Sequence, residues 1–207
     1  MDHLRERGYD VLHTREPGGT VIGEQIRALL LDPGRREMAA RTEMLLFAAS
    51  RAQLVAEVIV PALERGTLVV CDRYVDASLA YQGVGRGLGV EVVRAVNAAA
   101  TGGLEPDLTL LLDVEPALGL RRAAEASARE APPPGRGRAG RWDGGDRLER
   151  EALAFHERVR EGFLGLARNE PQRIRVVDAR GPVADVQRVI RGAVDTFLQR
   201  RCPGGSR

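Results

Sequence analysis

An aromatic ring and an arginine lie one helical turn apart in the segment RTEMLLFAASRAQLVAEVIVPALERG (41–66), as Phe47 and Arg51. At 100° per residue, Glu43 falls on the same side of a helix as Phe47, whereas Leu45 falls nearly opposite. Core packing is the ordinary explanation for an aromatic residue in a helix. A flat ring beside a guanidinium also suits a planar ligand with hydrogen-bonding edges, so the pair is a candidate binding site.

Two further polar clusters directly follow apolar runs. Asp72 and Arg73 come after TLVVC, and Arg15 and Glu16 come after DVLHT, where a Pro-Gly-Gly turn leads to Thr20 as a candidate helix cap. A surface ion pair beside a turn explains each cluster equally well when it is taken alone. In an open parallel sheet, however, ligands bind beyond the carboxyl ends of the strands, which is where both clusters fall.

Four short apolar runs alternate with longer amphipathic segments. These runs are DVLHT (10–14), TLVVC (67–71), LTLLLDV (108–114) and RIRVV (173–177). The alternation predicts an α/β fold with buried parallel strands and helices between them. Pro116 and Pro182 occupy likely first helical positions, and Gly66 ends the long helix.

Composition limits the class of protein. The chain has 207 residues, 43% apolar and 29% charged, which suits one sizeable domain. A net charge of +2 does not suggest a nucleic-acid partner. No apolar run approaches the roughly 20 residues that cross a bilayer, and residues 1–15 contain no signal-peptide core, so we expect a cytoplasmic protein without a membrane partner. Cys71 and Cys202 are expected to be plain thiols.

All 31 residues counted as Lys plus Arg are arginine, because the sequence contains no lysine. Alanine and glycine are also abundant, so codon bias alone could account for this. Whatever the cause, the 207 residues supply no lysine for catalysis or for phosphate binding.

Five motifs occur in an order and at a spacing that resemble the bacterial thymidylate kinase family, over about residues 2–198. They are TREPGGT, LLFAASRAQL, DRYVDASLAYQGVGRG, PDLTLLLDV and DRLE. The resemblance implies a P-loop nucleoside monophosphate kinase fold of three layers, a parallel β-sheet flanked by helices. It also implies transfer of the γ-phosphoryl group of ATP to thymidine 5′-monophosphate (dTMP), giving dTDP for dTTP synthesis with the help of Mg²⁺.

The resemblance further implies a role for each residue of the clusters. Phe47 would stack on the thymine ring, and Arg51 would hydrogen-bond its carbonyl edge. Arg15 and Arg73 would hold the 5′-phosphate. Asp72 would act with Arg73 in catalysis by ordering Mg²⁺ and the attacking phosphate. The residues that would line the sugar and base pocket are Ser78, Tyr81 and Gln82.

The segment EAPPPGRGRAGRWDGGD (130–146) fits neither a helix nor a strand, and it predicts a mobile loop. In the resemblance it belongs to a lid, about residues 122–149 of a single domain spanning 1–207, that closes over ATP and excludes water. The lid residues that the resemblance marks are Arg122, Arg141, Arg147 and Glu149. The arginines are candidates to reach the transferring phosphate, with Arg141 and Arg147 as catalytic residues, although they could equally keep the loop in solution.

Family members begin with a strand and a G-x-x-x-x-G-K-[ST] loop, whereas this sequence begins near the end of the following helix, at MDHLRERG (1–8). In the family, the N–H groups of the loop cradle the ATP phosphates, its lysine bridges them and its hydroxyl holds Mg²⁺. The missing strand would be central in the sheet, so its loss predicts unpaired strand edges and an apolar slot. A misplaced start codon or a fragment is favoured over a genuine loss, because the acceptor residues are all present.

Two other functions stay open. One is a binding or regulatory module that holds dTMP without phosphorylating it, and the other is a related kinase with a different nucleotide acceptor. The pairing of Phe47 with Arg51 favours thymine among acceptors but does not separate an enzyme from a binder. Dimers are usual in the family, and the apolar helix 41–66 offers an interface, so we expect a homodimer.

Overall fold

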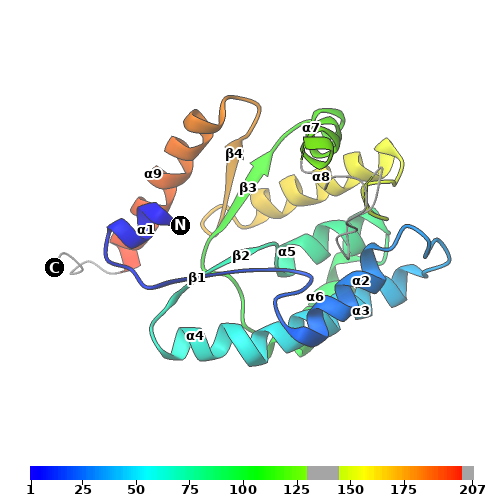
Figure 1. The fold of residues 1–207 in the computed structure, drawn as a ribbon, viewed down its shortest axis with the longest axis horizontal. Helices are drawn as coiled ribbons and strands as arrows, with labels where there is room; N and C mark the ends of the chain where they lie inside the picture. The colour runs from blue at the N-terminus through cyan, green and yellow to red at the C-terminus, as the bar shows by residue number, and fades with distance from the viewer. Residues whose placement is uncertain (130–144, 202–207) are drawn as a thin grey trace.

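The computed structural model describes residues 1–129 and 145–201 (Figure 1). The described strands are β1 (Val11–Arg15), β2 (Leu68–Asp72), β3 (Thr109–Asp113) and β4 (Ile174–Asp178). The described helices are α1 (Asp2–Glu6), α2 (Val21–Leu31), α3 (Ala40–Leu54), the π-helical η1 (Val55–Ile59), α4 (Val60–Glu64), α5 (Val75–Ser78), the π-helical η2 (Leu79–Gly85), α6 (Val90–Thr101), α7 (Pro116–Arg129), α8 (Leu153–Asn169) and α9 (Val183–Arg201). All four predicted strands are confirmed, with bounds that differ by one residue.

The described strands pair in two separate parallel sheets. β1 pairs with β2, so that Arg15 lies opposite Asp72, and β3 pairs with β4, so that Asp113 lies opposite Asp178. The parallel pairing and the intervening helices agree with the predicted α/β class. The single sheet of the prediction is interrupted between β2 and β3 (Figure 1).

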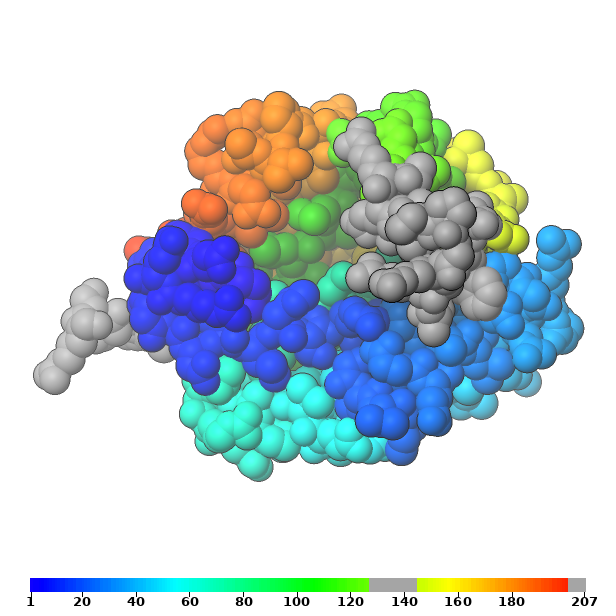
Figure 2. Space-filling model, viewed as in Figure 1, coloured from blue at the N-terminus to red at the C-terminus, as the bar shows by residue number. Residues whose placement is uncertain are grey.

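A cavity of about 1100 Å³ lies between the two sheets. Val69 and Cys71 of β2 line one wall, and Leu110 and Leu112 of β3 line another. No described strand pairs with the cavity-facing edge of either sheet. The cavity lies where the apolar slot was expected, although charged residues such as Asp72, Asp113 and Arg160 also line it. Figure 2 shows the β3 region recessed between the blue N-terminal segment and the orange C-terminal one.

A long helix runs alongside the first sheet as α3, η1 and α4 in succession (Figure 1). Pro61 has no N–H to donate to the carbonyl of Glu57, and the widened turn η1 ends two residues before it. The expectation that no apolar run approaches the length of a membrane span was wrong, because the helix Ala40–Glu64 is long and apolar enough by length and composition. A single helix of this kind is weak evidence for a span, because core helices of soluble proteins pass the same test.

Apolar side chains hold the helices against the strands. Leu54 and Ile59 of the long helix pack with Val69 of β2, and Leu166 of α8 packs with Ile174 of β4. Each fully buried aliphatic side chain of this kind stabilises the fold by about 1.5–3 kcal/mol. The packing fixes α3 beside the β1–β2 sheet and α8 beside β4, and these elements carry or support the candidate site.

Candidate active site

The turn TREPGGT (14–20) joins β1 to α2 and brings its polar side chains to the end of the first sheet. Gly19 has a φ of +79°, and a Cβ there would lie 2.6 Å from Leu54 Cδ1, so the turn requires glycine at this position. The Thr20 side chain accepts a hydrogen bond from Gly23 N over 2.9 Å, which confirms the predicted helix cap. Gly18 N donates to Ser50 Oγ over 3.1 Å and ties the turn to α3.

A second cavity, of about 230 Å³, lies where this turn, α3, η2 and the segment 145–149 meet. Seven of the predicted site residues line it. They are Phe47, Arg51, Arg73, Ser78, Tyr81, Gln82 and Glu149. The volume is below the roughly 300–1,000 Å³ of typical ligand pockets, so the cavity suits one part of a ligand rather than a whole nucleotide.

Phe47 packs in an apolar cluster and also lines the second cavity, so both environments considered for it from the sequence are present. Its side chain belongs to an apolar cluster with Leu30 and Leu31 of α2, and the residue is 9% exposed. It also lines the second cavity. Core packing and ligand contact are therefore not exclusive alternatives at this position.

Arg51 is buried, 1% exposed, and donates from all three guanidinium nitrogens. Its Nε donates to Glu16 Oε2 over 2.8 Å, and its Nη1 donates to Asn97 Oδ1 over 2.6 Å. Its Nη2 donates to Ser78 Oγ over 2.9 Å and to the Tyr74 carbonyl over 3.3 Å. A guanidinium has five N–H groups, so these four bonds to described residues leave one donor, on Nη1, for a ligand.

Glu16, the acidic member of the TREPGGT turn, forms this buried ion pair with Arg51. Burial raises the pKa of Glu16, and the charge and hydrogen bond of Arg51 oppose that shift without cancelling it. Its backbone N–H donates to the Asp72 carbonyl over 2.9 Å and so joins the ends of β1 and β2. The two strand-end clusters of the sequence therefore meet in the fold.

Arg73 lies directly after β2 and has a φ of +65° although it is not glycine. Its guanidinium lies over the Tyr81 ring, 5.1 Å from the centroid. Tyr81 in turn packs edge-on against Phe155 and Phe163 of α8, each with centroids 6.1 Å apart. Arg73 lines the second cavity and also the larger cavity between the sheets.

Arg15 and Asp72 lie outside the lining of this cavity. Arg15 is partly exposed and donates from Nη2 to Glu24 Oε1 over 2.9 Å. Asp72 is exposed and lines the larger cavity between the sheets. Among the described residues, no group of three or more His, Cys, Asp or Glu side chains is placed to hold a metal ion.

The lid residues occupy different places. Arg122 donates to the carbonyls of Ala179 and Arg180, each over 2.7 Å. Glu149 lines the second cavity and accepts a hydrogen bond from Asp146 N over 3.0 Å. Arg141 lies outside the described residues.

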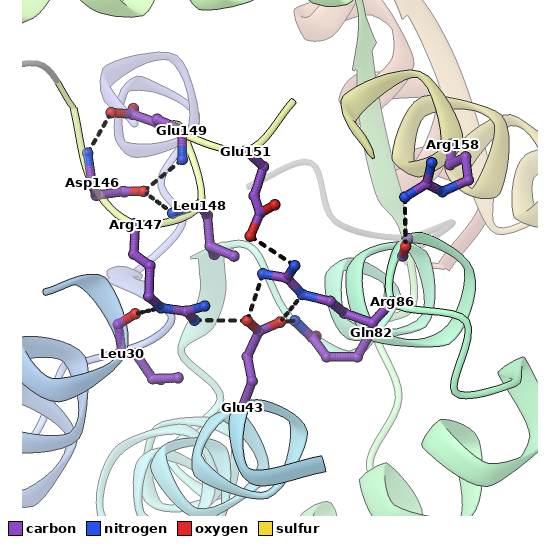
Figure 3. A network of polar contacts seen from close by, with 11 residues as sticks. Leu30, Glu43, Gln82, Arg86, Asp146, Arg147, Leu148, Glu149, Glu151 and Arg158 are labelled. Carbon is purple, nitrogen blue, oxygen red and sulfur yellow. Dashed lines mark hydrogen bonds and ion pairs between the residues drawn. The ribbon is translucent and has the colours of Figure 1, made fainter. Parts of the chain in front are cut away.

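Arg147 is buried at the end of the lid segment. Its Nε donates to the Leu30 carbonyl over 2.8 Å, and its Nη2 lies 2.7 Å from Glu43 Oε2 (Figure 3). In this structure the guanidinium is thus occupied by an internal ion pair. Its expected contact with the transferring phosphate would require these bonds to break.

Cys71 agrees with the expectation of a plain thiol. Burial raises its pKa to about 12, so the nucleophilic thiolate is scarce near neutral pH. Its Sγ donates to the Arg73 carbonyl over 3.0 Å. Cys202 lies outside the described residues.

The sequence reading missed a cluster around Glu43, which is fully buried on α3. Glu43 binds Gln82 and Arg86 of the η2 region as well as Arg147 (Figure 3). One feature of the sequence pointed to Glu43: it lies one helical turn before Phe47, on the same face of the helix. Its partners are 39 to 104 residues away, so local patterns could not identify them.

The chain is similar to proteins of one family along most of its length. The family model described as thymidylate kinase matches residues 1–190. A thymidylate kinase of Desulfovibrio desulfuricans is 50% identical over 203 residues, which are 98% of this chain and 89% of the relative. That of Deinococcus radiodurans is 52% identical over 92% of this chain and 84% of its own, and that of Symbiobacterium thermophilum is 47% identical over 99% and 87%.

Proposed function

The chain belongs to the thymidylate kinase family of nucleoside monophosphate kinases, and we propose that it transfers the γ-phosphoryl group of ATP to dTMP with the help of Mg²⁺. The observation that carries the proposal is the second cavity. It combines an aromatic ring, a guanidinium with one free donor and an amide in a space suited to a base. Arg73 supplies a positive charge at the same cavity.

Recognition of the base follows from five side chains that line the second cavity. Phe47 stacks on the thymine ring, and Arg51 donates its remaining Nη1 hydrogen to a ring carbonyl. Tyr81 and Ser78 line the sugar and base, and Gln82 supplies a further polar edge. The Glu16 carboxylate, paired with Arg51, keeps the guanidinium in a fixed orientation.

Residues at the ends of β1 and β2 bind the phosphate of dTMP. Arg73 and Arg15 hold the 5′-phosphate, because a guanidinium offers paired N–H donors that match phosphate oxygens. Asp72 supplies a hard carboxylate oxygen beside them, which is the ligand type that Mg²⁺ prefers. When bound, Mg²⁺ supplies charge neutralisation for the phosphoryl group in transfer.

The lid would act on ATP rather than on dTMP. Residues 122–149 close over ATP within a single domain, and Arg122, Arg141 and Arg147 are the candidates to contact the transferring phosphate, with Glu149 as their acidic companion. For Arg147, closure would exchange the ion pair with Glu43 for a phosphate contact. The chain is further proposed to act in the cytoplasm as a homodimer, with exposed Leu45 and Leu63 of the long helix at the interface.

A second candidate is a module that binds dTMP without phosphorylating it. One observation favours it: the 207 residues contain neither lysine nor a G-x-x-x-x-G-K-[ST] motif to hold the phosphates of ATP. A kinase with another acceptor nucleotide is a third candidate. It is less well supported, because the Phe47 and Arg51 arrangement suits thymine.

Two measurements on the purified 207-residue chain separate these candidates. Calorimetry with dTMP, dGMP and dAMP tests the acceptor, and the proposal expects binding of dTMP alone. Release of ADP from Mg²⁺ and ATP is then measured with and without dTMP. Turnover that depends on dTMP supports the kinase, and preference for a purine nucleotide would overturn both dTMP candidates. Binding without turnover supports the binding module only if a chain extended upstream in frame is also inactive.

A further inference from the structure

In the Gln82 side-chain amide, the NH₂ group has a described hydrogen-bond partner and the carbonyl oxygen does not. Its Nε2 donates to Glu43 Oε1 over 2.8 Å, and the residue is 1% exposed. No described residue donates a hydrogen bond to its Oε1. Because Gln82 lines the second cavity, this free acceptor is the end available to a ligand.

Two arginines fix the protonation state of Glu43 (Figure 3). Arg86 donates from Nε and Nη2 to the two carboxylate oxygens, over 3.1 and 2.8 Å, and Arg147 Nη2 lies 2.7 Å from Oε2. Burial alone would raise the pKa of Glu43, but the hydrogen bonds from Arg86 and Gln82 and the arginine charges outweigh burial and lower it.

An ionised carboxylate can only accept hydrogen bonds. Glu43 therefore forces Gln82 to turn its NH₂ group toward α3 and its Oε1 away. A neutral partner at the same place would allow either orientation of the amide. The orientation of Gln82 is thus set by a charge that does not itself line the cavity.

We propose that Glu43 is a positioning residue for base specificity, which presents Gln82 Oε1 to the cavity as a fixed hydrogen-bond acceptor. This inference rests on the proposed binding of a pyrimidine base in the cavity. An acceptor matches the N3–H group of thymine. It opposes the bare N3 atom of cytosine, which is also an acceptor, and two facing acceptors leave a buried polar group unpaired.

The test is the ratio of dissociation constants for dCMP and dTMP, measured by calorimetry on the whole chain. The parent is expected to bind dTMP at least about tenfold more tightly than dCMP. In Glu43→Asp, both arginines keep a charged partner, but the carboxylate is shorter and cannot hold Gln82. The ratio is expected to fall about tenfold, with the loss mainly in dTMP affinity.

Glu151→Gln is the matched control. Glu151 Oε1 lies 2.7 Å from Arg86 Nη1, so the variant removes a charge from the same network without touching Gln82. A merely structural role for the network predicts that Glu151→Gln and Glu43→Asp both lower the melting temperature and leave the ratio unchanged. Base specificity predicts a changed ratio in Glu43→Asp alone.

An unchanged ratio in folded Glu43→Asp would overturn the inference and leave the proposed function standing. Absence of dTMP binding by the parent would overturn both. Gln82→Met covers the case in which Glu43→Asp does not fold, because Glu43 keeps its two arginines there. That variant must also lose the preference for dTMP, and retention of the parent ratio would again overturn the inference.

Discussion

At the scale of single residues, Phe47 packs in an apolar cluster and also lines the second cavity, so its proposed contact with the base can be tested apart from its packing. Phe47→Leu keeps most of the apolar volume beside Leu30 and Leu31 but removes the flat ring. We expect dTMP binding to weaken by about 1–3 kcal/mol, the value of one stacked base, with a small change in melting temperature. Calorimetry with dTMP and a thermal melt measure the two effects separately.

Phe47→Ala provides the comparison. It removes the ring and also leaves a void against α2, so we expect a similar loss of dTMP affinity with a larger loss of stability, toward the 3–5 kcal/mol typical of Phe→Ala in cores. Equal dTMP affinity in Phe47→Leu and the parent would mean that Phe47 serves only the core.

The arginine at the end of β2 is the second test at this scale. Arg73→Lys keeps the positive charge but loses the planar pair of donors, so we expect dTMP to bind about tenfold more weakly. Thymidine lacks the phosphate, and its affinity should be the same in variant and parent. If the two ligands weaken equally, Arg73 supports the pocket through Tyr81 rather than binding phosphate.

At the scale of elements, Glu43 joins α3 to the η2 region and to the segment 145–151 (Figure 3). The pKa of Glu43 is lowered in the folded state, so its ionised form favours folding. This contribution is fully present above the unfolded pKa of 4.5 and is lost as pH falls below it, through the folded pKa.

A pH series of unfolding measurements tests this linkage. The free energy of unfolding of the parent should exceed that of Glu43→Gln at pH 7, and the difference should shrink as pH falls below 4.5. Glu91→Gln is the control, because the Glu91 side chain is 88% exposed, and we expect it to differ little from the parent at any pH. A parent-to-variant difference for Glu43 that is constant with pH would contradict the assignment.

At the scale of the whole molecule, none of the described strands pairs one sheet with the other, and the two sheets are joined through helices and side chains. Leu68 N bonds to the Asp10 carbonyl on the β1 side, and Thr109 N bonds to the Arg173 carbonyl on the β4 side. In a parallel strand, alternate residues bond to opposite neighbours. The N–H groups one residue further along each strand therefore point toward the cavity between the sheets.

Hydrogen exchange on the 207-residue chain tests this arrangement. We expect the amides of Val69 and Cys71 to exchange faster than that of Val70, and that of Leu110 faster than that of Leu111. The neighbouring amides act as internal controls, since they share the same strand and differ in the edge they face. Equal protection along β2 and β3 would show that the cavity-facing edges are paired in solution.

Much of this molecule is set by local sequence. The four strands were predicted within one residue because apolar runs bounded by polar residues are short-range patterns. The Thr20 cap was predicted from its own turn, and Phe47, Arg51 and Arg73 were singled out from helical spacing and strand ends. The other predicted residues that line the pocket came from a family resemblance, which carries tertiary information that spacing alone does not hold. They are Ser78, Tyr81, Gln82 and Glu149.

Partnership between distant residues was decided by the tertiary structure. Glu16 and Arg51 are 35 residues apart, and Glu43 and Arg147 are 104 apart, and both pairs are buried ion pairs. In the sequence, each of these residues is a charged side chain with an ordinary solvent-exposed alternative. Only packing of α3 between the turn, the η2 region and the segment 145–151 removes water from them, and desolvated charges must then find partners within the fold.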